Sequence, residues 1–207
     1  IEKDQLKLVA TDSYRLSEKI LKAQKISGAI HCIIPARTCI ELVNILGLGT
    51  AEETVEITVS KNQVLFLVGE IRVISRLIEG QFPNYQQIIP KNTKTQLYFN
   101  INELALALKR INIFAKENNN KIILRVHKNE VVITTDTTQY GEGEIRLKIK
   151  AEGVDNEVAL NSQYLLDVLG NLIEDDVVLE MGEKTTPVII RPVKSNDYLH
   201  IIMPLKI

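Results

Sequence analysis

The sequence predicts an α+β fold built from repeated units, each with one helix and about four antiparallel strands, with the helices on one face of curved sheets. Three observations support this prediction. An apolar stripe with helical spacing occurs three times along the chain. Alternating apolar segments follow each stripe and are joined by short polar turns. The 207 residues are 45% hydrophobic, which is enough apolar material for a packed core.

Each repeat begins with a short apolar strand that ends in a proline or asparagine and continues as a helix. Counting from Pro35, Asn100 and Asn161, apolar residues recur at +4, +7, +8 and +11, which places them on one helical face. Pro35 suits a first helical turn, and the two asparagines suit N-caps. The expected core faces are Cys39, Leu42, Val43 and Leu46; Leu104, Ala107, Leu108 and Ile111; and Leu165, Val168, Leu169 and Leu172.

Strands are expected after each helix, because apolar and polar residues alternate on both sides of short polar turns. One helix with its strands cannot bury its apolar stripe, so two units should pack together. The second and third units would form a complete domain over 94–207, and 1–93 would be an incomplete domain joined to it by a polar linker at 91–95. The predicted strands are 6–9, 55–59, 64–66, 123–126, 131–133, 177–181, 188–190 and 200–203.

Composition excludes several classes of protein. Lysine and arginine number 25 against 26 acidic residues, so a strongly basic nucleic-acid coat is excluded, whereas a local basic face is not. Two cysteines are too few for a disulfide scaffold, which favours a reducing compartment and a cytoplasmic protein. No apolar run approaches the roughly 18 residues needed to span a bilayer.

Motifs for catalysis and metal binding are missing from the sequence. It has no phosphate-binding loop, glycine-rich dinucleotide turn, nucleophile elbow or paired-histidine zinc motif. His31, Cys32 and Cys39 form at most part of a zinc site, and we expect a core strand and a core helix face there instead. The acidic run 174–176 fits a solvated turn better than a cation site. We therefore expect no catalytic residue, metal or cofactor, with a hydrolase or transferase of unrecognised site as the alternative.

Four stretches, 8–16, 76–85, 161–169 and 202–205, together closely resemble the bacterial DNA polymerase III beta subunit family, the beta sliding clamps. The resemblance covers the whole chain. It implies a DNA-clamp fold with three similar domains per subunit, a homodimeric ring when full length, and a non-catalytic accessory subunit of a DNA-directed DNA polymerase. By this resemblance 1–93 is the latter part of the middle domain and 94–207 the complete third domain.

The resemblance also implies a pocket that receives short peptides from DNA polymerase subunits, the clamp loader and repair proteins. Independently, the segment 199–205 is mostly apolar near the end of the chain, which is typical of an exposed binding patch, and Met203 would adapt to different peptides. An ordinary core edge strand is the alternative. The matched positions are Thr11, Ser13, Tyr14, Arg15, Leu16, Pro83, Gln87, Ile88, Asn161, Tyr164, Pro187, Ile201, Ile202, Met203, Pro204 and Leu205.

The family commonly has Gly-His where this chain has Ser13-Tyr14, and often arginine where it has Gln87. These departures bear on peptide preference rather than on the existence of the pocket.

The helices of the family line a hole through which duplex DNA passes. Cations on them would contact phosphates without reading bases, so the ring could slide. The resemblance also places a subunit interface at Ile113 and Phe114, and ring closure needs a first domain that this chain lacks. We therefore expect this chain alone to hold DNA weakly. The alternative is a peptide-binding scaffold without DNA tethering. The candidate DNA-facing residues are Arg37, Lys109, Arg110 and Lys116.

Overall fold

The computed structural model describes residues 4–24, 26, 28–47, 54–137 and 141–207. Contacts divide the chain into a first unit, Ile1–Leu6 with Lys22–Asn84, and a second unit, Lys7–Leu21 with Tyr85–Ile207. The division therefore falls after Asn84, earlier than the boundary expected at 93/94. An early segment joins the second unit because its strand β2 (Arg15–Lys22) pairs with β14 (Tyr198–Ile202) near the end of the chain.

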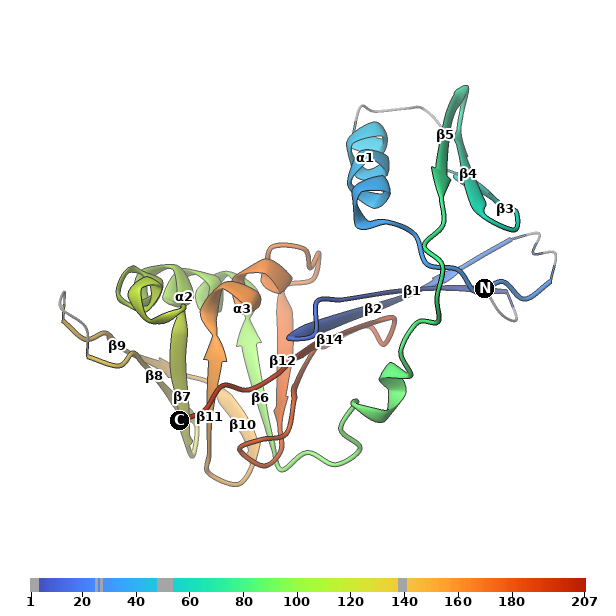
Figure 1. Cartoon of the computed structure of the whole chain (residues 1–207). Helices are drawn as coiled ribbons and strands as arrows, with labels where there is room; N and C mark the ends of the chain where they lie inside the picture. Colours follow the sequence, from blue (N-terminus) through green and yellow to red (C-terminus); the bar gives the residue numbers. More distant parts are fainter. Residues whose placement is uncertain (1–3, 25, 27, 48–53, 138–140) are drawn as a thin grey trace. The chain divides into compact units, whose positions relative to one another are not determined.

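The first unit contains one helix and an antiparallel sheet of order β3-β4-β5 in the part of the chain that is described (Figure 1). The predicted strands 55–59 and 64–66 are present, joined by a turn in which Ser60 N–H donates to Gln63 O at 2.8 Å. An isolated bridge pairs Ile33 with Ile78. The elements of the first unit are α1 (Ala36–Gly47), β3 (Glu56–Val59), β4 (Gln63–Val68) and β5 (Ile71–Arg76).

The core face predicted for α1 is wrong at Cys39, Val43 and Leu46, which are exposed. No residue of α1 is buried, and Val43 is 68% exposed. The half-buried positions are the predicted Leu42 together with Thr38 and Ile45, which recur at helical spacing. Thr38 Oγ1 lies 2.8 Å from Ser75 Oγ on β5, so this face meets the sheet. A single small sheet covers only a narrow stripe of the helix, and the wider predicted face stays in solvent.

The positions predicted for the two cysteines are also wrong. Cys32 and Cys39 are free thiols and both are exposed, so neither belongs to a core strand or a core helix face. His31 is exposed as well. Across the described ranges, no group of three or more histidine, cysteine, aspartate or glutamate side chains is arranged to hold a metal ion.

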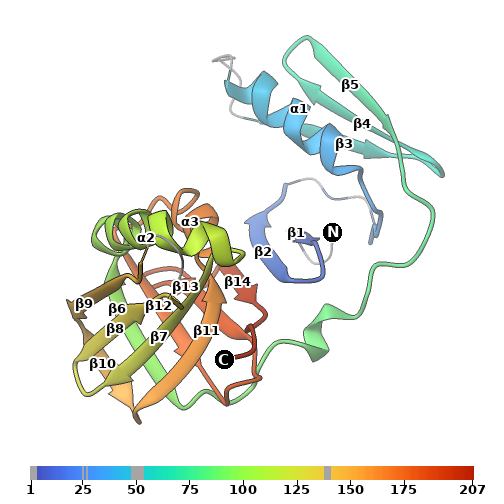
Figure 2. The same ribbon diagram turned by 60° about the vertical axis from the view of Figure 1, so that its left-hand side comes forward.

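The second unit holds two helices and two antiparallel sheets among the residues described (Figure 2). One sheet has the order β1-β2-β14-β13-β12-β6-β10 and the other β11-β7-β8-β9. The further elements are β1 (Gln5–Thr11), η1 (Tyr85–Gln87), β6 (Thr95–Asn100), α2 (Ile101–Ala115), η2 (Lys116–Asn118), β7 (Lys121–His127), β8 (Glu130–Thr134), β9 (Glu144–Lys148), β10 (Lys150–Gly153), β11 (Asn156–Asn161), α3 (Ser162–Leu169), β12 (Asp176–Met181) and β13 (Val188–Pro192).

Helices α2 and α3 lie side by side on the same side of the sheets in both views (Figures 1 and 2). Both predicted N-caps are confirmed: Asn100 and Asn161 each accept two backbone N–H groups with the side chain. Leu172 follows the end of α3 and is half-buried against the same core. The other seven predicted core positions of α2 and α3 are buried: Leu104, Ala107, Leu108, Ile111, Leu165, Val168 and Leu169.

No described helix is long and apolar enough to cross a membrane.

Each sheet combines strands from both repeats, because β6 pairs with β12 and β11 pairs with β7. The prediction that two repeats complete one core is therefore confirmed. The predicted linker does not extend through 95, since Thr95 opens β6, is 1% exposed and donates to Val154 O at 2.7 Å. Gly153 has a φ of +102°, and a Cβ there would lie 2.0 Å from Lys94 O, so only glycine fits this crossing.

The acidic run after α3 forms a bend, as predicted. Glu174 and Asp175 lie between α3 and β12, and Asp176 opens the strand. Ser195 Oγ donates to a carboxylate oxygen of Glu174 at 2.8 Å.

Candidate functional site

The turn between β1 and β2 is held by its own side chains. Asp12 Oδ1 accepts the backbone N–H groups of Tyr14 and Arg15, each at 3.0 Å. Thr11 Oγ1 accepts from Ser13 N–H at 3.2 Å and donates to Arg15 O at 2.8 Å. Ser13 has a φ of +76°, a left-handed conformation that glycine adopts without strain, which accounts for the glycine that the resemblance leads one to expect there. The turn presents Tyr14 to solvent, 62% exposed.

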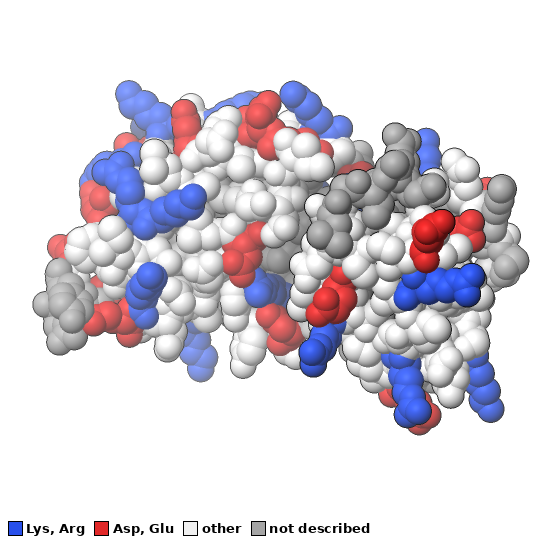
Figure 3. Space-filling view, turned by 90° about the horizontal axis from the view of Figure 1, so that it is seen from above, with Lys and Arg blue, Asp and Glu red and all other residues white. Residues whose placement is uncertain are grey.

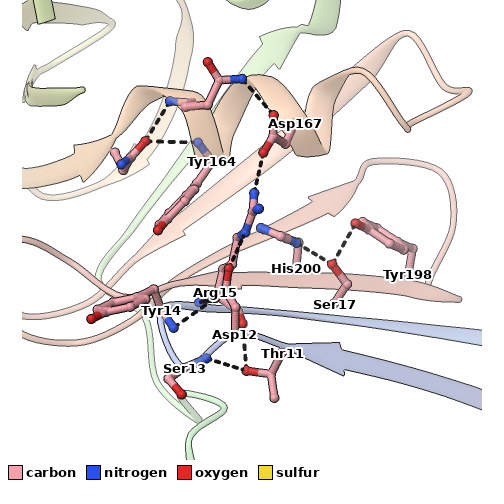
Figure 4. Close-up of polar contacts among 12 residues, drawn as sticks. Thr11, Asp12, Ser13, Tyr14, Arg15, Ser17, Tyr164, Asp167, Tyr198 and His200 are labelled. Atoms are coloured by element: carbon pink, nitrogen blue, oxygen red, sulfur yellow. Dashed lines mark hydrogen bonds and ion pairs between the residues drawn. The ribbon is translucent and has the colours of Figure 1, made fainter. Parts of the chain in front are cut away.

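Arg15 ties this turn to α3 (Figure 4). Its Nε donates to Asp12 Oδ2 at 2.9 Å, and its Nη1 donates to Asp167 Oδ2 at 2.5 Å. The guanidinium carbon lies 4.4 Å from the centre of the Tyr164 ring, within the range of a cation–π contact. Burial is the largest single influence on Asp167 and works against its charge, but the hydrogen bonds from Arg15 and Gln163 and the charge of Arg15 together outweigh it, so the pKa of this carboxyl is lowered. The same balance lowers the pKa of Asp12.

Asn161 begins α3 and thereby positions Tyr164. Its Oδ1 accepts the N–H groups of Gln163 at 2.9 Å and Tyr164 at 3.3 Å. Its Nδ2 donates to Asn119 O at 3.1 Å, which fixes the amide in this orientation. Asn161 is therefore engaged in capping, while the half-buried Tyr164 faces the Arg15 guanidinium.

The end of the chain lies between the β1–β2 turn and β11. Met203 N–H donates to Tyr14 O at 2.8 Å, and Leu205 N–H donates to Ala159 O at 2.8 Å. These two backbone bonds fix the segment after β14 in an extended course. Met203 is 37% exposed, and Pro204 and Leu205 are half-buried. Apolar side chains of this segment therefore remain accessible beside Tyr14.

Three of the predicted peptide-contacting residues lie in the interior. Leu16 and Ile201 are 2% and 1% exposed and belong to a small core with Ile189 and Leu199. Ile202 is fully buried in the main core of the second unit. These side chains support the surface from beneath. Pro187, half-buried, directly precedes Val188, which is the partner of Ile202 across β13 and β14.

Three further predicted peptide contacts, Pro83, Gln87 and Ile88, are exposed. Gln87 ends η1 and Ile88 follows it, 44% exposed. Tyr85 anchors this stretch, because it packs on the small core and its hydroxyl donates to Glu18 Oε2. Pro83 is exposed and belongs to the first unit.

A cleft of about 520 Å³ lies beside Arg15, and the sequence did not point to most of its lining. Its polar groups include Ser17, Asp167, Tyr198 and His200, from β2, α3 and β14. These elements are distant in the chain: β14 pairs with β2, which places His200 opposite Ser17, and α3 is joined to β2 by the hydrogen bond from Arg15 to Asp167. Burial and the nearby Arg15 charge lower the pKa of His200 to about 4, so its imidazole is neutral at pH 7.

The predicted DNA-facing cations are all exposed. Lys109 and Arg110 lie on α2, Lys116 begins η2, and Arg37 lies on α1 in the first unit. On the face drawn in Figure 3, lysine and arginine side chains stand apart, interspersed with acidic and uncharged residues. This face therefore offers phosphate individual cations rather than a continuous basic surface.

The two predicted interface residues differ in exposure. Ile113 on α2 is 71% exposed. Phe114, the next residue, is half-buried.

Comparison with known families gives two consecutive matches that together cover nearly the whole chain. Residues 1–84 match the model of the DNA polymerase III beta subunit, central domain, and residues 86–206 match that of its C-terminal domain. The two matched regions meet within a residue of the division seen in the structure, between Asn84 and Tyr85.

Individual proteins show the same relationship. The beta sliding clamps of Staphylococcus aureus (strain Mu50) and Staphylococcus epidermidis are 29% and 31% identical to this chain over its whole length. The crystal structure of the Bacillus subtilis DNA polymerase sliding clamp superposes with a TM-score of 0.94 at 26% identity, covering all of this chain and 55% of that one. A Pseudomonas aeruginosa sliding clamp bound to griselimycin gives 0.92 at 25% identity, covering all of this chain and 56% of that one. The chain spans about half the length of the curated relatives it matches, 55% in both staphylococcal cases.

Proposed function

The chain belongs to the DNA polymerase III beta subunit family, and we propose that it serves as part of a sliding clamp, the processivity factor of DNA replication. In this role a ring formed by two complete subunits encircles duplex DNA without reading its sequence. It tethers DNA polymerase, and also binds the clamp loader and repair proteins, through short peptides. The subunit is a non-catalytic, cytoplasmic accessory to the polymerase.

The observation that carries the proposal is the accessible apolar end of the chain. Met203 and Leu205 are fixed by backbone bonds to Tyr14 and Ala159, and Tyr14 beside them is exposed. An extended segment with accessible apolar side chains next to an aromatic ring suits short apolar peptides. The griselimycin complex of the Pseudomonas aeruginosa clamp supports the idea that this fold can bind a ligand.

Tethering to DNA is supported by the place of the cations. Lys109 and Arg110 are exposed on α2, whose opposite face fills the core. Contacts from such cations to phosphates give affinity without sequence preference, as a sliding ring requires. The net charge of -1 keeps general attraction to DNA weak, so retention would depend on encirclement.

The domain assignment follows the two family matches. We propose that the chain holds the latter part of a middle domain, predicted as 1–93, followed by a complete third domain, predicted as 94–207. The matches and the contact division support a junction near Asn84.

The test of the peptide site is isothermal titration calorimetry with a synthetic peptide from the polymerase partner. Burial of a leucine or methionine side chain is worth roughly 1.5–3 kcal/mol, so Met203→Ala with Leu205→Ala should weaken binding about tenfold or more. Ile207→Ala, which changes an exposed side chain two residues further on, is the matched control and should bind normally.

Unchanged affinity in the double variant, with an unchanged melting temperature, would contradict the pocket assignment. Normal peptide binding by a complete ring that fails to stay on DNA would favour the alternative, a peptide-binding scaffold without DNA tethering.

A further inference from the structure

The cleft beside Arg15 contains a buried histidine that is only half satisfied. His200 is 4% exposed, and its Nδ1 lies 2.7 Å from Ser17 Oγ, which in turn lies 3.4 Å from Tyr198 Oη. Its Nε2 is buried and has no hydrogen-bond partner. Figure 4 shows the imidazole between Ser17 and Arg15, with the ring edge away from Ser17 directed to the Arg15 side. A polar atom left in this state is energetically unfavourable unless a partner reaches it.

The charges around the cleft are unbalanced. Its charged lining residues are the carboxylates of Asp12 and Asp167 and the single guanidinium of Arg15. Arg15 already donates to both carboxylates through Nε and Nη1. The charge of Arg15 lowers the pKa of His200, and the charges of Asp12 and Asp167 raise it. An incoming anion would meet two carboxylates and only one cation that is already engaged.

The polar groups around the cleft are mainly acceptors. When Nδ1–H donates to Ser17 Oγ, the neutral imidazole offers a lone pair at Nε2. The carboxylates add further lone pairs. No three metal-ligating side chains of the described residues converge here, which argues against a metal ion as the occupant. A ligand with several N–H donors and a positive charge would satisfy both the orphan atom and the excess charge.

We propose that this cleft binds a primary alkylammonium group, with His200 Nε2 accepting one N–H and the Asp167 carboxylate balancing the charge. Ala10 and Val168, which also line the cleft, offer apolar contact to the alkyl stem. The group can come from a lysine side chain of a partner protein or from a free polyamine, which share this chemistry. The inference does not depend on peptide or DNA binding.

The test is a titration of the protein with n-butylammonium chloride, followed by NMR on the imidazole signals of the three histidines. We expect a saturable shift of His200 and none at His31 or His127. Hydrogen bonds to charged groups are strong enough that Asp167→Asn should weaken the interaction about tenfold or more. The matched control is Asp155→Asn, which removes a carboxylate bonded to His127 outside the cleft and should leave the titration of His200 unchanged.

Two further probes, one without N–H donors and one without charge, test the proposal without any substitution in the protein. Tetramethylammonium has the charge but no N–H, and n-butanol has the stem but no charge, so both should bind much more weakly. No saturable shift with n-butylammonium, or equal shifts with all three probes, would overturn the proposal, and so would full affinity in a folded Asp167→Asn protein. Titrations with Nα-acetyl-lysine methylamide and with cadaverine then distinguish the two sources. Tighter binding of the lysine derivative indicates a lysine side chain of a partner protein, and tighter binding of cadaverine indicates a free polyamine.

Discussion

The guanidinium of Arg15 holds the β1–β2 turn against α3 by donating from Nη1 to Asp167 Oδ2 at 2.5 Å, across 152 positions of the chain. The same side chain lies over the Tyr164 ring and borders the cleft that contains His200. One residue therefore fixes the geometry of two neighbouring surfaces: the apolar end of the chain beside Tyr14, and the polar cleft between α3 and β14.

Removing this ion pair should cost little overall, because its two side chains are 29% and 40% exposed. A double-mutant cycle with Arg15→Met and Asp167→Asn, measured by urea unfolding, should give a coupling energy of about 0.5–1 kcal/mol. The pair Lys19 and Asp197, at 2.8 Å and more exposed, is the matched control and should couple less. A coupling no greater than that of the control pair would show that Arg15 does not organise this region.

Acid should destabilise the protein through His200. Its pKa is lowered to about 4 from an ordinary 6.5, first by burial and then by the charge of Arg15. Between these values the unfolded chain takes up a proton that the folded chain does not, so the free energy of unfolding falls as the pH drops from 6.5 toward 4. The full shift corresponds to about 3 kcal/mol.

Urea unfolding from pH 7 to pH 4.5 checks this expectation. The variant His200→Gln should lose most of the pH dependence in this window, whereas His127→Gln, at an exposed histidine, should retain it. The same slope in both variants would mean that His200 does not control acid stability. The carboxyls of Asp12 and Asp167 have lowered pKa values, so their contributions are lost at still lower pH.

Truncation of Leu108 should destabilise the protein much more than truncation of Ile113, although both are apolar residues of α2. Leu108 is fully buried and Ile113 is 71% exposed. Leu108→Ala should lower the free energy of unfolding by about 2–5 kcal/mol, because it opens a cavity in the core. Ile113→Ala should change it by less than about 0.5 kcal/mol. If Ile113 belongs to a subunit interface, its truncation should instead weaken self-association of the complete subunit in sedimentation experiments, and unchanged association would remove that assignment.

Cations on α2 should contribute to DNA binding additively and without sequence preference. Each phosphate contact lowers the slope of log K against log salt by about 0.9, so Lys109→Glu with Arg110→Glu should make the slope shallower by about 2. Fluorescence anisotropy with duplex DNA at several salt concentrations measures this slope. Lys148→Glu makes half of this charge change, at an exposed residue of β9, and should have little effect. Equal losses in both variants would indicate only a general charge effect.

Local patterns were sufficient to predict both helices and most strands of the second unit, but not β2, β9 and β10. The stripes of α2 and α3 point to a core that two sheets complete, so periodicity and burial agree, and Asn100 and Asn161 cap as their types suggest. The face of α1 was predicted wrongly because the same periodicity does not reveal how much neighbouring structure covers a helix. Thr38 binds Ser75 and turns a different stripe to the sheet.

The cleft could not be predicted because its residues carry no local signal. His200 and Ser17 meet through strand pairing between the two ends of the chain, and Asp167 joins them through Arg15. Each is an ordinary polar residue in its own segment. Tyr14 was identified only through a family resemblance, whereas the apolar segment 199–205 gave an independent indication for Met203 and Leu205.

The most direct test of the proposed function is retention of the complete subunit on circular duplex DNA after loading, compared with the same DNA cut once. A closed ring that binds phosphates weakly should stay on the intact circle at moderate salt and leave quickly once the circle is linearised. Retention that is equal on circular and linear DNA, or loss from both at the same rate, would contradict a sliding clamp.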